Sequence, residues 1–460
     1  MIIEDKFHQA IEKYSLLRQN DSVLVALSAG PDSTMLLYLL HKIRNKYKLK
    51  LSAVYINHQI RKEAAKEEAM FCRNLCESLN IKLHIIEKDI PKLSKKLKKG
   101  IEETGRDFRY QTFKELSDKS GFTKVALGHH ADDRVETILF RVIRGTGRQG
   151  LLGIQPKRGN YIRPLYFMTK DEIIRYLNRK KIDYCTDQSN SDSRYTRNYI
   201  RNELLPELRK KLNPAVESSL LNLSETIAEE EKYLTELTEK KLKKIYSESQ
   251  GGKILLNTEM LKKSDLWLRR RIFRNVLSKF SENGQQLNKD TIDMIDDFLY
   301  SAKTALSLPG RLMIRKAEDV LVLSHNKKLS FQKKLVVDKV LRIKQLRYVV
   351  SVEVKNITET ELVKKRQSFF GQFDYSKLTP PFAIRTIGVA DRFSPLGLNG
   401  SKKIGDYLTD KKIAPVFRDE IPVVTDKKGI FWLVGFEIEN RAKIDKHTKE
   451  VLEIEFKSEK

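Results

Sequence analysis

The chain has 460 residues, which at about 150 residues per domain predicts roughly three domains. Forty per cent of the residues are hydrophobic, so the composition excludes a chain that is disordered throughout. Lysine and arginine outnumber aspartate and glutamate by 88 to 61, and the resulting net charge of +27 indicates a polyanionic partner, either nucleic acid or an anionic membrane surface.

The cysteines and the apolar runs narrow the class further. Cys72, Cys76 and Cys185 are too few for a disulfide framework or a four-cysteine zinc site, and they favour a reducing compartment. The first residues lack the pattern of a signal peptide, and no apolar run approaches the roughly 18 residues that would span a bilayer. We therefore expect a soluble, cytoplasmic protein of several domains with no membrane partner.

The first two hundred residues alternate helix and strand signals. The pattern predicts helices at 4–18, 33–47, 62–79, 102–117 and 132–144, and strands at 23–27, 51–56, 82–87 and 124–128. Strands separated by helices predict an α/β domain with a doubly wound parallel sheet, whose ligands bind at the carboxyl ends of the strands.

The alternation of helix and strand signals ends after this region. Residues 185–200 are polar and rich in turn formers, and the charged helical pattern at 213–247 predicts a long linker helix. Helices at 264–280 and 288–301 and a hairpin at 308–311 predict a small mixed domain, and strands such as 346–354 and 430–434 dominate the last third. The expected domains are therefore 1–212, then 213–330 with the linker helix, then a strand-rich 331–460, the last two being smaller α+β units.

The loop between the first strand and the next helix has the composition of a phosphate site. Its residues are Ser28, Ala29, Gly30, Pro31, Asp32 and Ser33. The start of a helix offers unpaired backbone N–H groups to an anion, the two serines add hydroxyl donors, and Asp32 is the candidate for holding Mg²⁺ on the phosphates. The loop lacks the Gly-Lys-Ser/Thr ending of a Walker A loop. Its composition therefore favours binding of a departing pyrophosphate over transfer of a phosphoryl group. An ordinary capped turn is the alternative reading of the same residues.

A second polar segment, Gly128-His129-His130-Ala131-Asp132-Asp133-Arg134-Val135-Glu136-Thr137, follows the strand at 124–128. Asp133 and Glu136, hereafter the acidic pair, are three residues apart and so share one helical face. Carboxylates at a helix start also arise from simple dipole stabilisation, and the spacing is not that of a structural zinc site.

These two segments resemble known motifs. Residues 28–33 resemble the pyrophosphate loop (PP-loop) of the N-type ATP pyrophosphatases, with Ala29 where that family usually has glycine. Residues 129–137 resemble the second motif of the tRNA(Ile)-lysidine synthetase family, with Arg134 in place of the usual glutamine. Further stretches resemble the same family at 103–110, 147–154, 187–190, 197–201, 391–393, 400–403, 418–422 and 432–435.

The resemblance implies a ligase that uses ATP and Mg²⁺. Such an enzyme adenylates the C2 carbonyl oxygen of the wobble cytidine in the CAU anticodon of tRNA(Ile), releases pyrophosphate, and lets free lysine displace AMP to form lysidine; the codon read changes from AUG to AUA and the amino-acid identity from Met to Ile. It implies catalytic roles for Asp32, Asp133, Glu136 and Arg201, and substrate-binding roles for Arg106, Arg109, His130, Lys402 and Lys403. The oligomeric state is open, with a homodimer as one arrangement.

Two other functions stay open at this point. A tRNA sulfur transferase of the 2-thiocytidine type shares the PP-loop, although such chemistry calls for paired cysteines on loops, and Cys185 stands alone. A non-catalytic tRNA-binding protein with a degenerate loop is the other alternative, and it would not convert ATP to AMP and pyrophosphate.

Overall fold

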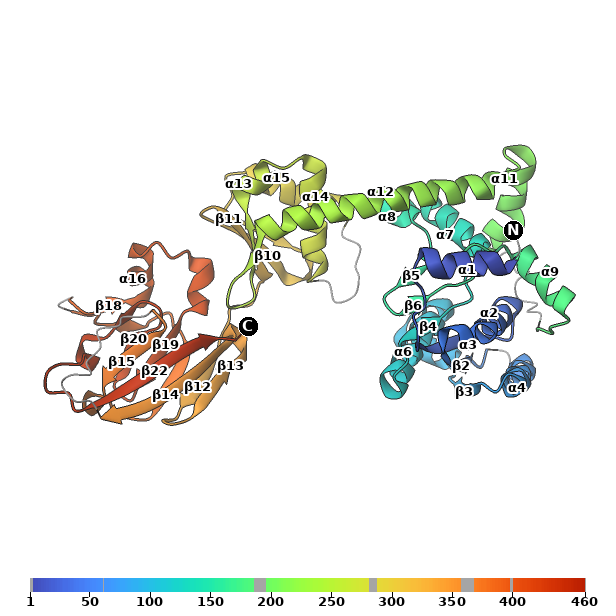
Figure 1. Cartoon of the computed structure of the whole chain (residues 1–460). Coiled ribbons are helices and arrows are strands. Elements are labelled where there is room, and N and C mark those ends of the chain that lie inside the picture. Colours follow the sequence, from blue (N-terminus) through green and yellow to red (C-terminus); the bar gives the residue numbers. More distant parts are fainter. Residues whose placement is uncertain are drawn as a thin grey trace. The chain divides into compact units, whose positions relative to one another are not determined.

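The computed structural model describes residues 3–60, 62–185, 196–280, 288–356, 368–397 and 400–459. It divides into two compact units, Met1–Tyr233 and Leu234–Lys460, and the division falls within the long helix α12 (Val216–Ile245), which Figure 1 shows as one continuous helix. The family-like stretch 187–190 lies outside the described residues. The three-part division expected from the sequence stays a prediction.

A six-stranded sheet organises the first unit. Its strands lie in the order β3-β2-β1-β4-β6-β5. Their bounds are β1 Ser22–Leu27, β2 Lys50–Asn57, β3 Lys82–Glu87, β4 Lys124–Ala126, β5 Lys157–Arg158 and β6 Tyr161–Ile162. All neighbours pair in parallel except β5 and β6, which form an antiparallel hairpin at the edge. The expected parallel α/β sheet is confirmed.

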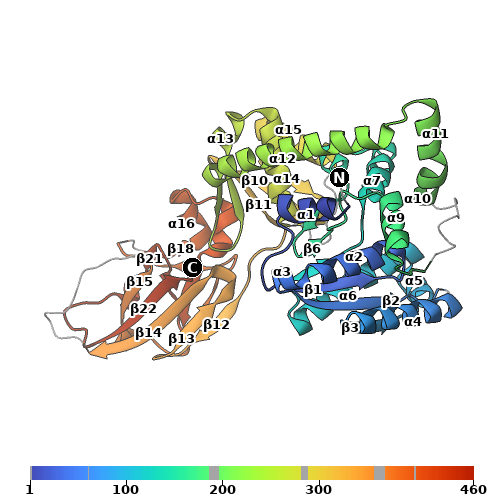
Figure 2. The same cartoon turned by 45° about the vertical axis from the view of Figure 1, so that its right-hand side comes forward.

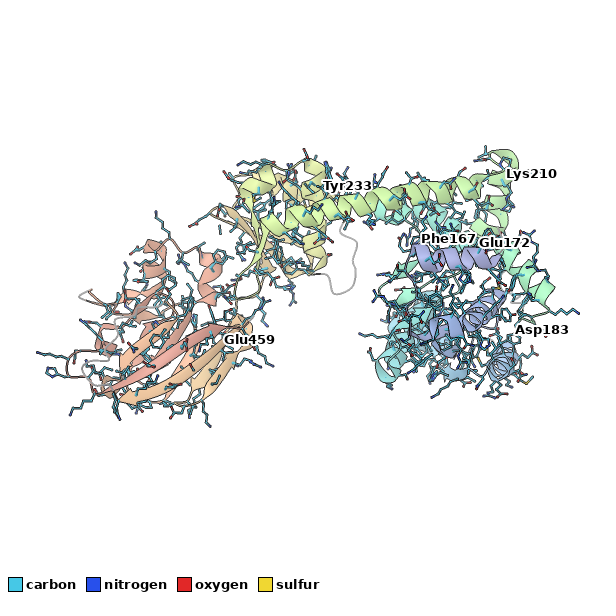
Figure 3. All side chains as sticks on the ribbon, in the orientation of Figure 1. Phe167, Glu172, Asp183, Lys210, Tyr233 and Glu459 are labelled. Atoms are coloured by element: carbon cyan, nitrogen blue, oxygen red, sulfur yellow. The ribbon has the colours of Figure 1, made fainter. Side chains whose placement is uncertain are left out.

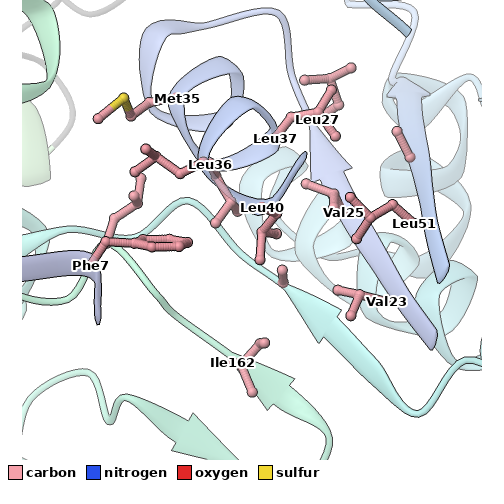
Figure 4. Close-up of a cluster of buried hydrophobic side chains, with 14 of the residues drawn as sticks. Phe7, Val23, Val25, Leu27, Met35, Leu36, Leu37, Leu40, Leu51 and Ile162 are labelled. Atoms are coloured by element: carbon pink, nitrogen blue, oxygen red, sulfur yellow. The ribbon is translucent and has the colours of Figure 1, made fainter. Parts of the chain in front are cut away.

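Helices cover both faces of this sheet. The helices of this unit are α1 Ile3–Lys13, α2 Pro31–Lys42, α3 Arg44–Tyr47, α4 Lys62–Ser78, α5 Ile90–Leu97, α6 Ile101–Ser120, α7 Ala131–Ile143, α8 Arg148–Leu151, α9 Lys170–Lys180, α10 Thr196–Tyr199 and α11 Leu205–Lys211, with a π-helical turn at Ile200–Leu204. In Figure 2 the strands of this unit are seen with α2 and α3 beside β1. Because side chains alternate along a strand, Val23 and Val25 pack with α1 and α2 on one face (Figure 4), whereas Leu24 packs with Phe113 of α6 on the other. The sheet is therefore doubly wound.

One predicted helix is interrupted. The stretch expected as a single helix at 33–47 is α2 followed by the short α3, and the break is at Ile43, whose φ and ψ are −93° and 1°. Ile43 is buried and Tyr47 packs against the same core, so the apolar pattern continues through the break and gives no sign of it.

The second unit begins with a five-stranded antiparallel sheet in the order β7-β8-β11-β10-β9. The strands are β7 Tyr246–Glu248, β8 Ile254–Asn257, β9 Ala305–Leu308, β10 Leu312–Ala317 and β11 Val320–His325, and the helices are α13 Thr258–Lys262, α14 Leu266–Ser278 and α15 Lys289–Tyr300. The antiparallel pairing of β9 with β10 confirms the hairpin predicted at 308–311.

The remaining strands form two larger sheets and one small one. Their orders are β12-β16-β19-β20-β21, β13-β14-β22-β15 and β17-β18. The bounds are β12 Gln332–Leu335, β13 Val340–Ile343, β14 Tyr348–Asn356, β15 Phe370–Asp374, β16 Phe382–Thr386, β17 Arg392–Phe393, β18 Lys402–Lys403, β19 Pro422–Asp426, β20 Gly429–Leu433, β21 Glu437–Ile438 and β22 Glu450–Ser458, with α16 at Ile404–Asp410. Side chains from both larger sheets, among them Phe431 and Ile454, share one core, so these sheets pack face to face. Among the helices that the model describes, none has the length and apolar character to cross a membrane.

Candidate active site

The carboxyl ends of two neighbouring strands bring the two motifs together. Strand β1 pairs with β4 in parallel, with Val25 opposite Ala126. The PP-loop follows β1 directly, and the second motif follows β4. A Cβ atom on Gly128 would lie 3.3 Å from the backbone nitrogen of Ser33 and 3.3 Å from the carbonyl carbon of Asp32, so glycine allows this close approach of the two segments. Strand order, which the sequence does not state, is what makes the motifs neighbours.

Internal hydrogen bonds hold the PP-loop in a tight turn. The backbone N–H of Ser28 donates to Ser33 Oγ at 3.0 Å, and the Ser33 hydroxyl donates to the Gly30 carbonyl at 3.0 Å. Ala29 is buried with a φ of +61°, a left-handed conformation that favours glycine. Ser28 is exposed, whereas Ser33 is 4% exposed. Ser33 therefore closes the turn, and the exposed Ser28 places its hydroxyl 3.2 Å from Ser33 Oγ.

Asp32 lies at the start of α2 and is contacted by two cationic groups. Lys170 Nζ lies 2.7 Å from each of its carboxylate oxygens, and His130 Nε2 lies 3.7 Å from one of them. Helix α9, which carries Lys170, packs against α2. Figure 3 labels Glu172 on the same helix, where it pairs with Lys6 of α1 at 2.7 Å. No motif in the sequence marks Lys170, although the capping-box residues Thr169 and Glu172 indicate that a helix begins here.

His130 connects Asp32 with the start of α7. Its Nδ1 lies 3.2 Å from Asp132, and its backbone N–H donates to Asp133 at 3.0 Å. Burial by itself lowers the pKa of His130, but the close contact with Asp132 and the charges of Asp133 and Asp32 outweigh it, so the pKa is raised. His130 therefore carries positive charge more readily than a free histidine.

Two arginines neutralise the acidic pair. Arg197 Nε lies 2.7 Å from Glu136, and its Nη2 lies 2.9 Å from Asp133. Arg201 Nε lies 2.5 Å from the other oxygen of Glu136. Burial raises the pKa of Asp133, but the nearby charges of His130 and Arg197 outweigh it and the pKa is lowered. The site thus contains two carboxylates and two guanidiniums side by side. Arg197 stands in the stretch 197–201, where the family resemblance implies a role for Arg201 alone.

Arg134, which stands where the family usually has glutamine, is held by packing and an ion pair. Its guanidinium carbon lies 3.7 Å from the centre of the Tyr166 ring, and Nη2 lies 3.4 Å from Glu225 of α12. The side chain is 2% exposed. It therefore packs between α7 and α12 and takes no part in the cluster around the acidic pair.

The four other predicted residues do not belong to the set of ion pairs just described. Arg106 and Arg109 are exposed on α6, and within the described chain neither guanidinium forms an ion pair with Asp32 or the acidic pair. Lys402 and Lys403 belong to the second unit, in β18; Lys402 pairs with Asp410, and Lys403 is exposed.

Two family models and several curated relatives match this chain. A family model described as a PP-loop domain matches residues 1–208, and one described as the TilS substrate C-terminal domain matches residues 383–455. The fold and the loop therefore define a PP-loop protein. A tRNA(Ile)-lysidine synthase of Caldanaerobacter subterraneus subsp. tengcongensis is 32% identical over 99% of this chain and 98% of its own length, and one of Clostridioides difficile is 30% identical over 99% of both. The chain belongs to the tRNA(Ile)-lysidine synthase family.

Proposed function

We propose that the chain joins free lysine to C2 of the wobble cytidine in the CAU anticodon of tRNA(Ile), through an adenylated cytidine. The observation that carries this proposal is the juxtaposition of the PP-loop with the acidic pair in a chain related to lysidine synthases over its full length. The chain is accordingly an ATP-using ligase that forms a carbon–nitrogen bond, which sets aside the sulfur transferase and the non-catalytic tRNA-binding protein. The cytoplasmic location and the homodimer stay predictions.

The first step is adenylation. The C2 carbonyl oxygen forms a bond to the α-phosphorus of ATP while the bond from that phosphorus to the bridging oxygen breaks, and pyrophosphate leaves with the bonding electrons. The hydroxyl of the exposed Ser28 and the N-terminal N–H groups of α2 are suited to receive the pyrophosphate, because they offer donors and a positive dipole end.

Asp32 is the residue suited to hold Mg²⁺. Its oxygens already lie 2.7 Å from one cation, the ammonium of Lys170, and its side chain is 29% exposed and so reachable. No group of three or more metal-ligating side chains occurs among the described residues. This donor set fits Mg²⁺, which commonly takes one or two carboxylates and completes its shell with phosphate and water oxygens. Bound there, the ion neutralises charge on the phosphates.

The acidic pair and its arginines suit a zwitterion. Free lysine carries an α-carboxylate and an α-ammonium besides its ε-amine, and a cluster of two carboxylates and two guanidiniums can pair with both charges. The ε-ammonium has a pKa of about 10.4 and must lose a proton before it attacks. Both carboxylates of the acidic pair are our candidates for binding the ammonium and accepting its proton. The amine then forms a bond to C2, the bond from C2 to oxygen breaks, and AMP leaves.

The basic residues suit the tRNA. Phosphate contacts dominate the affinity of proteins for nucleic acids, and the net charge of +27 provides for them. We assign Arg106 and Arg109 to RNA or nucleotide phosphates near the site, and Lys402 and Lys403 to the tRNA backbone. The wobble base must leave the stack of the anticodon loop to reach the PP-loop.

The order of product release tests the proposal. With tRNA(Ile) and ATP but no lysine, pyrophosphate should appear at no more than one equivalent per enzyme and AMP should stay bound to cytidine. Adding lysine should release AMP and restore turnover. AMP release that is independent of lysine would contradict the proposed second step.

A further inference from the structure

Lys170 contacts Asp32 of the PP-loop although 138 residues separate the two in the sequence. It is the first residue of α9, and its backbone N–H donates to Asp132 at 2.8 Å. The capping box of Thr169 and Glu172 fixes the start of the same helix. The backbone of Lys170 is therefore anchored to the second motif while its side chain reaches the first.

The ammonium group has donor capacity to spare. An ammonium carries three N–H donors, and the two oxygens of Asp32 account for two of them. The Lys170 side chain is 35% exposed, so the group is accessible to a ligand that enters the loop. Both properties allow the ammonium to contact a ligand beside Asp32.

The PP-loop itself contains no lysine. In a Walker A loop a lysine of the loop reaches the β- and γ-phosphates, and residues 28–33 lack such a residue. The helix start of α2 offers N–H groups, but Pro31 at its first position contributes none. An ammonium brought in by α9 supplies the positive charge that the loop does not have.

We propose that Lys170 is a further substrate-binding residue, which exchanges its contact with Asp32 for a contact with a non-bridging oxygen of the β- or γ-phosphate and stays with the departing pyrophosphate. This inference rests on the proposed function of the PP-loop. Lys170 of α9 would then bind phosphate as the loop lysine does in Walker A proteins. Its movement to the nucleotide would free the carboxylate of Asp32.

The test is the binding of inorganic pyrophosphate to the full-length protein, measured by isothermal titration calorimetry in EDTA without tRNA or lysine. Because a hydrogen bond between charged groups is lost, Lys170→Met should raise the dissociation constant by about tenfold to a hundredfold. Lys170→Arg should recover part of the affinity. Lys6→Met is the matched control, since Lys6 forms an equally short pair with Glu172 on the same helix, and it should leave the affinity unchanged.

A second comparison separates direct binding from support of Asp32. In an Asp32→Asn background, Lys170→Met should still weaken pyrophosphate binding; no additional loss would show that Lys170 acts only through Asp32 and would overturn the inference. Equal affinity of the unmodified protein and Lys170→Met would overturn it as well, while leaving the proposed function intact. Absence of pyrophosphate binding by the unmodified protein would overturn the proposed role of the loop and this inference together.

Discussion

Arg201 Nε lies 2.5 Å from a carboxylate oxygen of Glu136, although 65 residues separate the two in the chain. Glu136 is 1% exposed, and its second oxygen accepts from Arg197 at 2.7 Å. A carboxylate buried to this extent is tolerated only when it is paired, so the two arginines and Glu136 depend on one another. The segment that carries Arg197 and Arg201 is thereby fastened to α7.

Replacing Glu136 by glutamine tests this dependence. We expect turnover to fall at least about a hundredfold, because the variant lacks a negative charge that we propose to pair with lysine and one of the two candidate bases. Stability should fall by about 1–3 kcal/mol, less than for a fully buried pair, because both guanidiniums reach solvent. Steady-state kinetics and urea unfolding measure the two effects. Glu4→Gln is the control: it removes a carboxylate of α1 that pairs with Lys42 of α2, and it should leave turnover within about twofold. A Glu136→Gln enzyme as active as this control would refute the catalytic role of Glu136.

Ala29 gives a prediction about strain in the PP-loop. Its φ of +61° is costly for a residue with a Cβ atom, so Ala29→Gly should raise the free energy of unfolding by about 0.5–1 kcal/mol. Ala10→Gly, at a buried position inside α1, should instead lower it by about 1 kcal/mol. Denaturant unfolding of the two variants gives the comparison, and a loss of stability in both would contradict the strained conformation.

The site could be foreseen from the sequence only in part. The buried apolar runs at 23–27 and 51–56 identified the parallel sheet, and the loop chemistry at 28–33 follows from the rule that ligands bind at the carboxyl ends of strands. That the loops after β1 and β4 adjoin depends on the strand order, which is a long-range property. The same holds for Lys170: at the start of an amphipathic helix a lysine has the pattern of a solvated residue, and only the packing of α9 on α2 brings it to Asp32.

His58 predicts a pH dependence of stability. Burial, helped by the charge of Arg109, lowers the pKa of His58 from 6.5 to about 4. Above pH 6.5 the imidazole is neutral in both the folded and the unfolded chain. As the pH falls from 6.5 towards 4, His58 binds a proton in the unfolded chain but stays neutral in the folded one, so the free energy of unfolding falls in this window. When the pH is lowered from 7.5 to 5.5, the free energy of unfolding should therefore fall by roughly 1 kcal/mol less in His58→Asn than in the unmodified protein.

Urea unfolding at the two pH values measures this difference. His325→Asn, the same substitution at an exposed position, serves as the control and should follow the unmodified protein. Parallel losses in His58→Asn and the unmodified protein would show that His58 takes up its proton equally in both states.

Lys403 tests the assignment of the C-terminal unit to tRNA. Since Lys403 is exposed in β18, Lys403→Ala should weaken binding to tRNA(Ile) and tRNA(Met) alike, as expected for a phosphate contact. The slope of log affinity against log salt concentration should fall by about 0.7–0.9. Filter binding over a range of salt concentrations measures this slope, with Lys66→Ala on α4 as an exposed-lysine control. An unchanged slope would remove Lys403 from the contact surface.

Transfer of lysine to a tRNA base is tested most directly in one incubation of the full-length protein with labelled lysine, ATP, Mg²⁺ and a tRNA(Ile) transcript that carries CAU. The parallel reaction contains tRNA(Met) with the same anticodon. We predict stable incorporation of label into tRNA(Ile) alone, with one AMP formed per lysine incorporated. AMP formation without incorporated label, or equal labelling of both tRNAs, would contradict the account.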